Sequence, residues 1–165
     1  MFLTVLAGTL FSWLESSSVA LFFRQSLWLY PAVEIVHISS FSFLVGAAVL
    51  FDLRLLGLSK KFPIIDCLRY LKFWARISFS LIVPSGFILF MVDATSLASN
   101  TAFLLKLILI FLALLNAWIF QRYTMRSVHL WNTGITPPLK ARFAGTFSIL
   151  MWISVISCGR LIAYI

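Results

Sequence analysis

Four ionisable residues lie within one apolar stretch of the sequence, WLYPAVEIVHISSFSFLVGAAVLFDLRLLG: Glu34, His37, Asp52 and Arg54. An ionisable side chain in hydrocarbon costs on the order of 2.5–3.5 kcal/mol by insertion scales, so such residues usually face a partner, a cavity or a cofactor. A carboxylate can carry a proton or balance a cation, and an imidazole can ligate haem iron or exchange a proton near neutral pH. This stretch is therefore the first place to look for function.

Three of these residues share one face of the helix that the stretch predicts. At 100° per residue, Glu34, His37 and Asp52 form a narrow stripe. A later apolar stretch carries Lys106 at a depth that matches Glu34 and His37, and Asn116 follows on the same face near the middle of the membrane. We expect a polar site in the outer half of the protein, built from four residues: Glu34, His37, Lys106 and Arg160.

Each of these residues also has a structural interpretation. Glu34 and Lys106 form a buried ion pair that fixes helix register as readily as they form a functional site. His37 is as readily a hydrogen-bonded structural histidine as a haem ligand or proton carrier. Asp52 and Arg54 lie near the inner edge of the membrane, where polar side chains reach the interface, which favours a role in topology and packing.

The second histidine restricts the haem chemistry that one chain can support. His129 follows Arg122 and Arg126, which places it at the cytoplasmic surface, whereas His37 lies towards the outside. A bis-histidine haem within one subunit is therefore not expected. A haem b held by His37 alone, or together with Met91 or a residue of another copy, stays open. No residues have the spacing of a zinc site, a Ser/His/Asp triad or a phosphate loop.

The composition is that of an integral membrane protein. Of the 165 residues, 62% are hydrophobic and 11% are charged, and the mean hydropathy is +1.04. A soluble domain of this length could not bury so much apolar surface. Four stretches lack Asp, Glu, Lys and Arg, and with their apolar flanks they approach the roughly 20 residues that a spanning helix needs. We expect an all-α, up-and-down bundle in a single domain (1–165), with four spans at about 29–57, 70–93, 101–124 and 141–164.

Residues 1–27 precede the first predicted span. Phe2–Trp13 is apolar but too short to cross a bilayer, and Glu15 with a run of serines interrupts the pattern. We expect one or two helices lying at the outer interface, with Arg24 and Trp28 at headgroup level. A signal anchor is the competing interpretation.

The second span contains Pro84 and Gly86 near its middle. Proline removes a backbone hydrogen bond and usually kinks a helix, while glycine permits a neighbouring helix to approach closely. A kink for packing is the simpler interpretation, and a cavity or ligand beside the kink is the alternative.

Basic residues are segregated along the chain, which has a formal net charge of +8. Ten of the 13 Lys and Arg residues surround the first and third connections: Arg54, Lys60, Lys61, Arg69, Lys72, Arg76, Arg122, Arg126, Lys140 and Arg142. The positive-inside rule places these ten in the cytoplasm and both termini outside it. A nucleic-acid surface has no need of such segregation, so the expected partner is the lipid bilayer, with a second copy or another membrane protein as further candidates.

Two sequence elements, W-L-Y-P-x-x-E-x-x-H and D-L-R-L-L-G, carry a resemblance to an uncharacterised bacterial family of small integral-membrane proteins, which extends over nearly the whole chain. The resemblance implies no established activity, and we expect a location in the bacterial inner membrane. More distantly, the layout is similar to HemJ-type protoporphyrinogen oxidases and CopD-type copper-resistance membrane domains. That similarity runs through His37, Gly46, Arg54 and Lys106, and it implies a b-type haem and electron transfer in the membrane.

The leading hypothesis is a membrane redox protein linked to haem b or to a quinone. In it His37 is the candidate axial ligand to the haem iron, Lys106 is the propionate or substrate partner, and Glu34 is a proton carrier or counter-ion. The alternative is a non-enzymatic membrane component that stabilises a partner or passes a small ion or solute, in which Glu34 and Lys106 only lock the bundle.

Overall fold

The described chain is entirely helical between its turns and loops. The computed structural model describes residues 2–164, and side chains from residue 8 onward, so residues 1 and 165 of the predicted domain lie outside it. Within this range the structure has seven α-helices, one 3-10 helix and no strand. The elements are α1 (Phe2–Glu15), α2 (Ser18–Gln25), α3 (Leu29–Leu55), α4 (Ile64–Val92), α5 (Ala94–Ser99), α6 (Thr101–Tyr123), η1 (Thr124–Leu130) and α7 (Leu139–Leu161). The all-α prediction is confirmed.

Four helices are long and apolar enough to cross a membrane: α3, α4, α6 continued by η1, and α7. Only 11–28% of the residues in the most apolar window of each helix are buried inside the protein. Large apolar side chains such as Phe43, Phe111 and Ile153 stay exposed, which lipid tails would tolerate and water would not. The chain is a multi-pass membrane protein, as its composition predicts.

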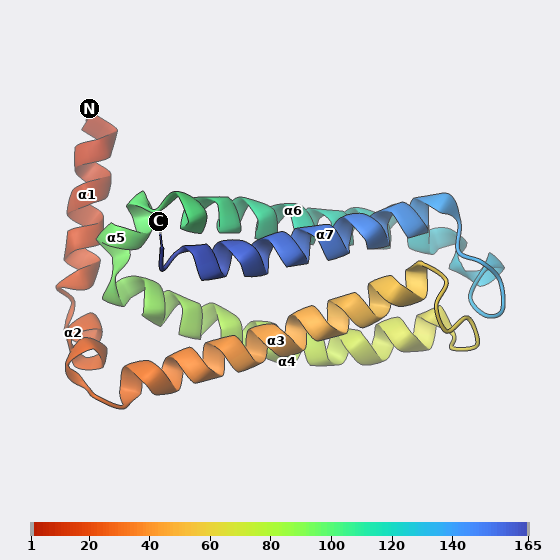
Figure 1. Ribbon diagram of the computed structural model, residues 1–165, viewed down its shortest axis with the longest axis horizontal. Coiled ribbons are helices and arrows are strands. Elements are labelled where there is room, and N and C mark those ends of the chain that lie inside the picture. Colours follow the sequence, from red (N-terminus) through yellow and green to blue (C-terminus); the bar gives the residue numbers. More distant parts are fainter. Residues whose placement is uncertain (1, 165) are drawn as a thin grey trace.

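The four long helices form two antiparallel hairpins (Figure 1). Helix α3 packs along α4, α6 packs along α7, and the two hairpins meet mainly where α3 contacts α7. Within the described residues, α4 and α6 make no extensive contact with each other. In Figure 1 α3 and α7 lie close together at the end that carries the α3–α4 and α6–α7 connections and move apart towards the end that carries α1, where α4 runs towards α5 and α6. We refer to these as the loop end and the α1 end.

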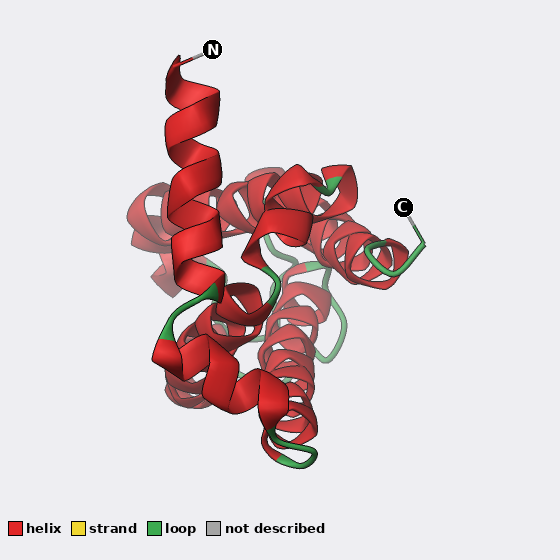
Figure 2. Ribbon diagram, turned by 90° about the vertical axis from the view of Figure 1, so that its left-hand side faces the viewer, coloured by secondary structure: helices red, strands yellow, loops and turns green. Residues whose placement is uncertain are grey.

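Helix α1 runs across the bundle rather than along it, as Figures 1 and 2 show from two sides. Two polar contacts fasten this N-terminal segment to the ends of the long helices. The Arg24 guanidinium of α2 donates to the carbonyl of Val92 at the end of α4. The Glu15 carboxylate accepts the backbone N–H of Thr95 in α5 at 2.8 Å. The two helices of this segment precede α3 and lie at one end of the bundle, while their place at the outer membrane interface stays a prediction.

Arg54 fastens the two connections at the loop end to each other. It is 3% exposed, and its Nε donates to the carbonyl of Phe62 at 2.8 Å. Its Nη2 donates to the carbonyls of Lys60 at 3.3 Å and Asn132 at 3.1 Å. Because Lys60 lies in the α3–α4 connection and Asn132 in the α6–α7 connection, one guanidinium holds both, in line with the packing role expected for Arg54.

Asn132 also caps α4 from the other hairpin. Its carbonyl accepts the N–H of Ile64 at 3.1 Å, and its side-chain oxygen accepts the N–H of Ile65 at 3.0 Å. The first N–H groups of a helix have no partner within the helix, and the residue before α4 is Pro63, which offers no capping side chain. This external cap, with Pro63 at the boundary, explains why α4 begins at Ile64, before the apolar span itself.

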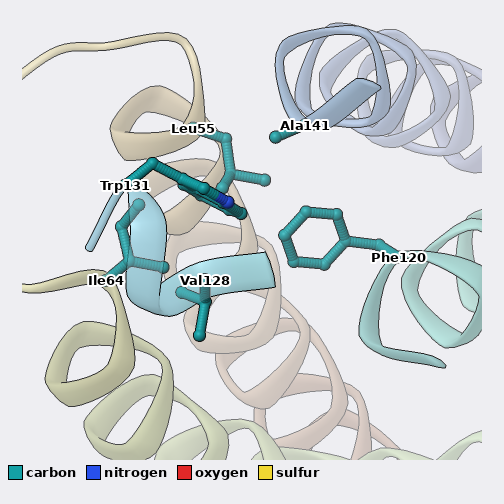
Figure 3. Close-up of a cluster of buried hydrophobic side chains, with 6 residues drawn as sticks. All are labelled: Leu55, Ile64, Phe120, Val128, Trp131 and Ala141. Atoms are coloured by element: carbon teal, nitrogen blue, oxygen red, sulfur yellow. The ribbon is translucent and has the colours of Figure 1, made fainter. Parts of the chain in front are cut away.

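An apolar cluster seals the loop end beneath these hydrogen bonds. Figure 3 shows Phe120 and Trp131 pointing into the space between the long helices, with smaller side chains around them. The cluster consists of Leu55, Ile64, Phe120, Val128, Trp131 and Ala141. The loop end is therefore a packed and hydrogen-bonded base, from which α3 and α7 move apart.

Candidate functional site

A cavity of about 580 Å³ opens where α3 and α7 move apart, and the first turns of α6 border it. We call it the α1-side cavity. Its wall includes His37, Phe41 and Gly46 of α3, Lys106 of α6, and Val155 and Gly159 of α7. Its volume lies in the usual range for small-molecule sites, and most of its wall is apolar with few polar groups, as such sites require.

His37 is held in one orientation by α4. Its Nδ1 lies 3.0 Å from the hydroxyl oxygen of Ser85, and Ser85 is 5% exposed. The Ser85 hydroxyl is closest to the carbonyl of Leu81, at 2.6 Å, so its single proton is donated there. With that proton committed, the tautomer of the neutral ring that pairs with Ser85 has its hydrogen on Nδ1 and donates it to Ser85. Nε2 is left as the acceptor of the ring and its potential metal ligand.

Gly86 makes room for the imidazole. A Cβ atom placed on Gly86 would lie 2.8 Å from Cε1 of His37, closer than real contacts allow. The predicted close approach of a neighbour at this glycine is present, and the neighbour is His37 itself. Helix α4 runs through Pro84 without interruption.

Lys106 reaches the same cavity from α6. Its Nζ lies 5.9 Å from the centroid of the Phe41 ring and would be 3.7 Å from a Cβ on Gly159. It also interacts electrostatically with His37. His37 and Lys106 therefore line the same cavity, as their matched depth predicts, and the Phe41 ring lies beside Lys106.

Glu34 and Arg160 do not join them. Glu34 is exposed and its electrostatic contact is with Tyr30, one turn closer to the start of α3. Among the described residues neither Glu34 nor Lys106 takes part in an ion pair, so the register-fixing pair considered for them does not form. Arg160 is exposed and donates to the Tyr164 hydroxyl at 2.8 Å. Both lie near the α1 end but outside the lining of the cavity.

The other candidate haem ligands lie elsewhere. Met91 is absent from the described lining of the α1-side cavity, and His129 is exposed in η1 at the loop end. The described residues contain no cluster of three or more His, Cys, Asp or Glu suited to a metal ion. Within this lining, His37 is the single imidazole.

A second cavity, of about 200 Å³, lies closer to the loop end and is bounded by all four long helices. We call it the loop-side cavity. Asp52 and Asn116 line it, so these two predicted polar positions belong to a different space from His37 and Lys106. Asp52 is 5% exposed and accepts a hydrogen bond from the Ser148 side chain. Asn116 donates through Nδ2 to the carbonyl of Ala144 at 3.0 Å.

Sequence reasoning did not single out Ser85 and Ser148. Each supports an ionisable residue of α3 from a neighbouring helix. A serine inside an apolar span is a weak signal because it can satisfy its own hydroxyl on the preceding turn, as Ser154 and Ser157 do. Burial distinguishes Ser85 and Ser148 from serines such as Ser154 and Ser157, and burial is known only from the packed structure.

Comparison with known proteins gives one match. A family model described as "Family of unknown function (DUF6644)" matches residues 10–165 of the chain. No curated protein and no solved structure matches it. The match fits the expected uncharacterised family, whereas no similarity to HemJ-type or CopD-type proteins is shown.

Proposed function

The chain belongs to this family of unknown function (DUF6644), and from its own geometry we propose that the α1-side cavity binds a lipid-soluble quinone or quinol in a membrane redox reaction. The observation that carries the proposal is the orientation of His37. Ser85 occupies Nδ1, so Nε2 is available to accept a hydrogen bond from a quinol hydroxyl.

The cavity also suits the shape and polarity of a quinone. Phe41, Val45 and Val155 offer apolar contacts to a ring, while Lys106 supplies a cation that can donate to a ring oxygen or balance a quinolate. Ile38 and Ile156 are exposed where they border the cavity, so its opening faces the surroundings of the bundle. In a bilayer those surroundings are lipid, from which a quinone would enter.

In this reaction His37 would accept the first proton that the quinol releases. A quinol that gives a hydroxyl proton to Nε2 creates an imidazolium, and Ser85 continues to accept the hydrogen on Nδ1. Complete oxidation of the quinol to quinone releases two protons and two electrons, and the electrons pass to a separate redox carrier. The proposal therefore makes this chain the quinone-binding component of a membrane redox system.

Quinone binding to the purified protein tests the proposal. We expect His37→Ala to weaken the binding of a short-chain ubiquinone or menaquinone analogue at least tenfold, because its principal polar partner is lost. Lys106→Met should weaken it severalfold while keeping the length of the side chain. Binding is measured by quenching of intrinsic tryptophan fluorescence in detergent micelles.

The chain offers matched controls for both substitutions. His129→Ala removes an exposed histidine at the loop end, and Lys61→Met removes an exposed lysine of the α3–α4 connection. Equal quinone affinity in His37→Ala and His129→Ala would overturn the assignment. If neither a quinone nor a haem binds, the non-enzymatic alternative is left, in which the chain supports a partner or passes a small solute.

Haem b is the second candidate for this cavity, favoured by the same free Nε2. When bound, a haem supplies one-electron chemistry; His37 would be its ligand and Lys106 a partner for a propionate. Within the described lining His37 is the one residue that would hold the iron, and a second such residue would come from another copy of the chain. The absorption spectrum of detergent-purified protein after haem-supplemented expression tests this: a Soret band should vanish in His37→Ala and persist in His129→Ala.

We also propose that the chain lies in the bacterial inner membrane with its loop end in the cytoplasm. The support is the basic character of the two connections at that end, which include Lys60, Lys61 and Lys140. Alkaline phosphatase fused to the C-terminus should be active, because it folds only outside the cytoplasm. A fluorescent protein that matures only in the cytoplasm should stay dark at the same position. The reverse pattern would invert the topology.

A further inference from the structure

The loop-side cavity has no part in the function proposed above, yet it contains a buried carboxyl group without a counter-ion. We propose that it binds a small lipophilic amine in its protonated form, with Asp52 as the counter-ion. The argument rests on the size of the cavity, on the unpaired oxygen of Asp52 and on the second acceptor beside it.

Small side chains create the space. Six alanines line the loop-side cavity: Ala47, Ala48, Ala75, Ala113, Ala117 and Ala144. Phe51, Phe120 and Trp152 add aromatic surface to the same wall. An apolar cavity of about 150 Å³ is known to hold benzene, so a volume of about 200 Å³ accommodates one ring with a short substituent.

Asp52 brings an unpaired acceptor to this apolar space. Its carboxylate receives one hydrogen bond from Ser148, but Oδ2 is buried and has no partner among the described residues. Arg54 lies two positions along α3 and its guanidinium is directed to the loops. Lys72 of α4 lines the cavity but forms no ion pair with Asp52. A buried carboxylate without a cation is unfavourable, and a ligand ammonium would remove that deficit.

Asn116 places a second acceptor in the same wall. Its Nδ2 is committed to the carbonyl of Ala144, which fixes the orientation of the amide and leaves Oδ1 as an acceptor. Ala144 and Ser148 lie one turn apart on α7, so Asn116 and Asp52 are bound to neighbouring positions of one helix. An ammonium group has three N–H donors and can donate to both oxygens. An anion would be repelled by these two acceptor oxygens.

Access to the cavity is open between two helices. Helices α4 and α6 do not pack extensively against each other, and Leu114 and Ala117 of α6 are exposed where they border the space. A lipophilic amine partitions into the membrane with its charge near the interface. It would therefore reach the cavity from the side, with its ring entering between α4 and α6.

Titration calorimetry of the detergent-purified protein and four variants tests the proposal. The probes are 2-phenylethylamine and its neutral counterpart 2-phenylethanol, at neutral pH where the amine is protonated. We expect the amine to bind wild type at least tenfold more tightly than the alcohol. Asp52→Asn keeps the shape of the side chain and should weaken amine binding at least tenfold while changing alcohol binding less than threefold.

Three further variants keep the result interpretable. Asp66→Asn removes an exposed carboxylate of α4 outside the cavity and should leave both affinities unchanged. Ala117→Phe places a ring at the opening and should weaken both probes, and Ile119→Phe, outside the lining, should not. Equal affinity of wild type for amine and alcohol would identify an apolar cleft for lipid tails and overturn the proposal. So would amine binding that survives both Asp52→Asn and Ala117→Phe.

Discussion

Replacing Arg54 with alanine should lower the free energy of unfolding by about 3–5 kcal/mol. The guanidinium donates to three carbonyls in a space where the residue is 3% exposed, so its removal leaves Phe62, Lys60 and Asn132 without this donor. Hydrogen bonds to a charged group contribute about 1.5–3 kcal/mol each, and water entering the gap recovers part of the loss. Unfolding by SDS titration in mixed micelles measures the change.

Two comparisons make this expectation specific. Arg54→Lys keeps the charge but has one nitrogen in place of the planar fork, so it should recover less than half of the lost stability. Arg69→Ala removes an exposed arginine of α4 and should change stability by less than about 1 kcal/mol. A similar small change for Arg54→Ala would show that the two connections hold together without it.

Replacing Gly86 with alanine should destabilise the protein by about 1–3 kcal/mol and abolish quinone binding. The new Cβ would lie 2.8 Å from Cε1 of His37, so the imidazole must move and lose its hydrogen bond to Ser85. Alanine otherwise favours a helix over glycine by about 1 kcal/mol, so a loss of stability here cannot come from the backbone. Thermal unfolding and the quinone titration measure the two effects.

A double-mutant cycle identifies the cause. In a His37→Ala background the ring is gone, and Gly86→Ala should then be neutral or slightly stabilising, which gives a coupling energy of about 1 kcal/mol or more. For stability alone, Gly46→Ala is the matched control, because a Cβ there would meet nothing within 4 Å, although Gly46 lines the cavity. If Gly86→Ala is equally harmful with and without His37, the contact between the two is not what this glycine preserves.

The sequence predicts the helices of this fold better than it predicts the neighbours of each residue. Runs without charge indicate four long apolar helices because a membrane span must be apolar throughout. Depth along a span is equally readable, which is why His37 and Lys106 are found in one cavity. The azimuth of a residue around its helix is less informative. His37 and Asp52 share a stripe of α3, but His37 contacts Ser85 of α4 and Asp52 contacts Ser148 of α7.

The contacts that no pattern predicts are those that depend on two connections meeting. Asn132 caps α4 only because the α6–α7 connection is folded against Pro63 and Ile64. A helix start is usually recognised from its own preceding residue, and here that residue gives no signal. The burial of Arg54 has the same origin, because its partners are backbone carbonyls, which every residue possesses.

The hydrogen-bonded base at the loop end fixes one end of α3, so a small change in the tilt of this helix displaces its other end. Helix α3 has 27 residues and is therefore about 40 Å long, so a tilt of about 5° about its fixed end would displace the other end by about 3.5 Å. Residues beside the base would barely move, whereas the gap between His37 and the facing helix α7 would widen or close by a substantial part of a ring's thickness. Bilayer thickness and curvature act on helix tilt. Through the tilt of α3 they would set how readily the α1-side cavity admits its ligand.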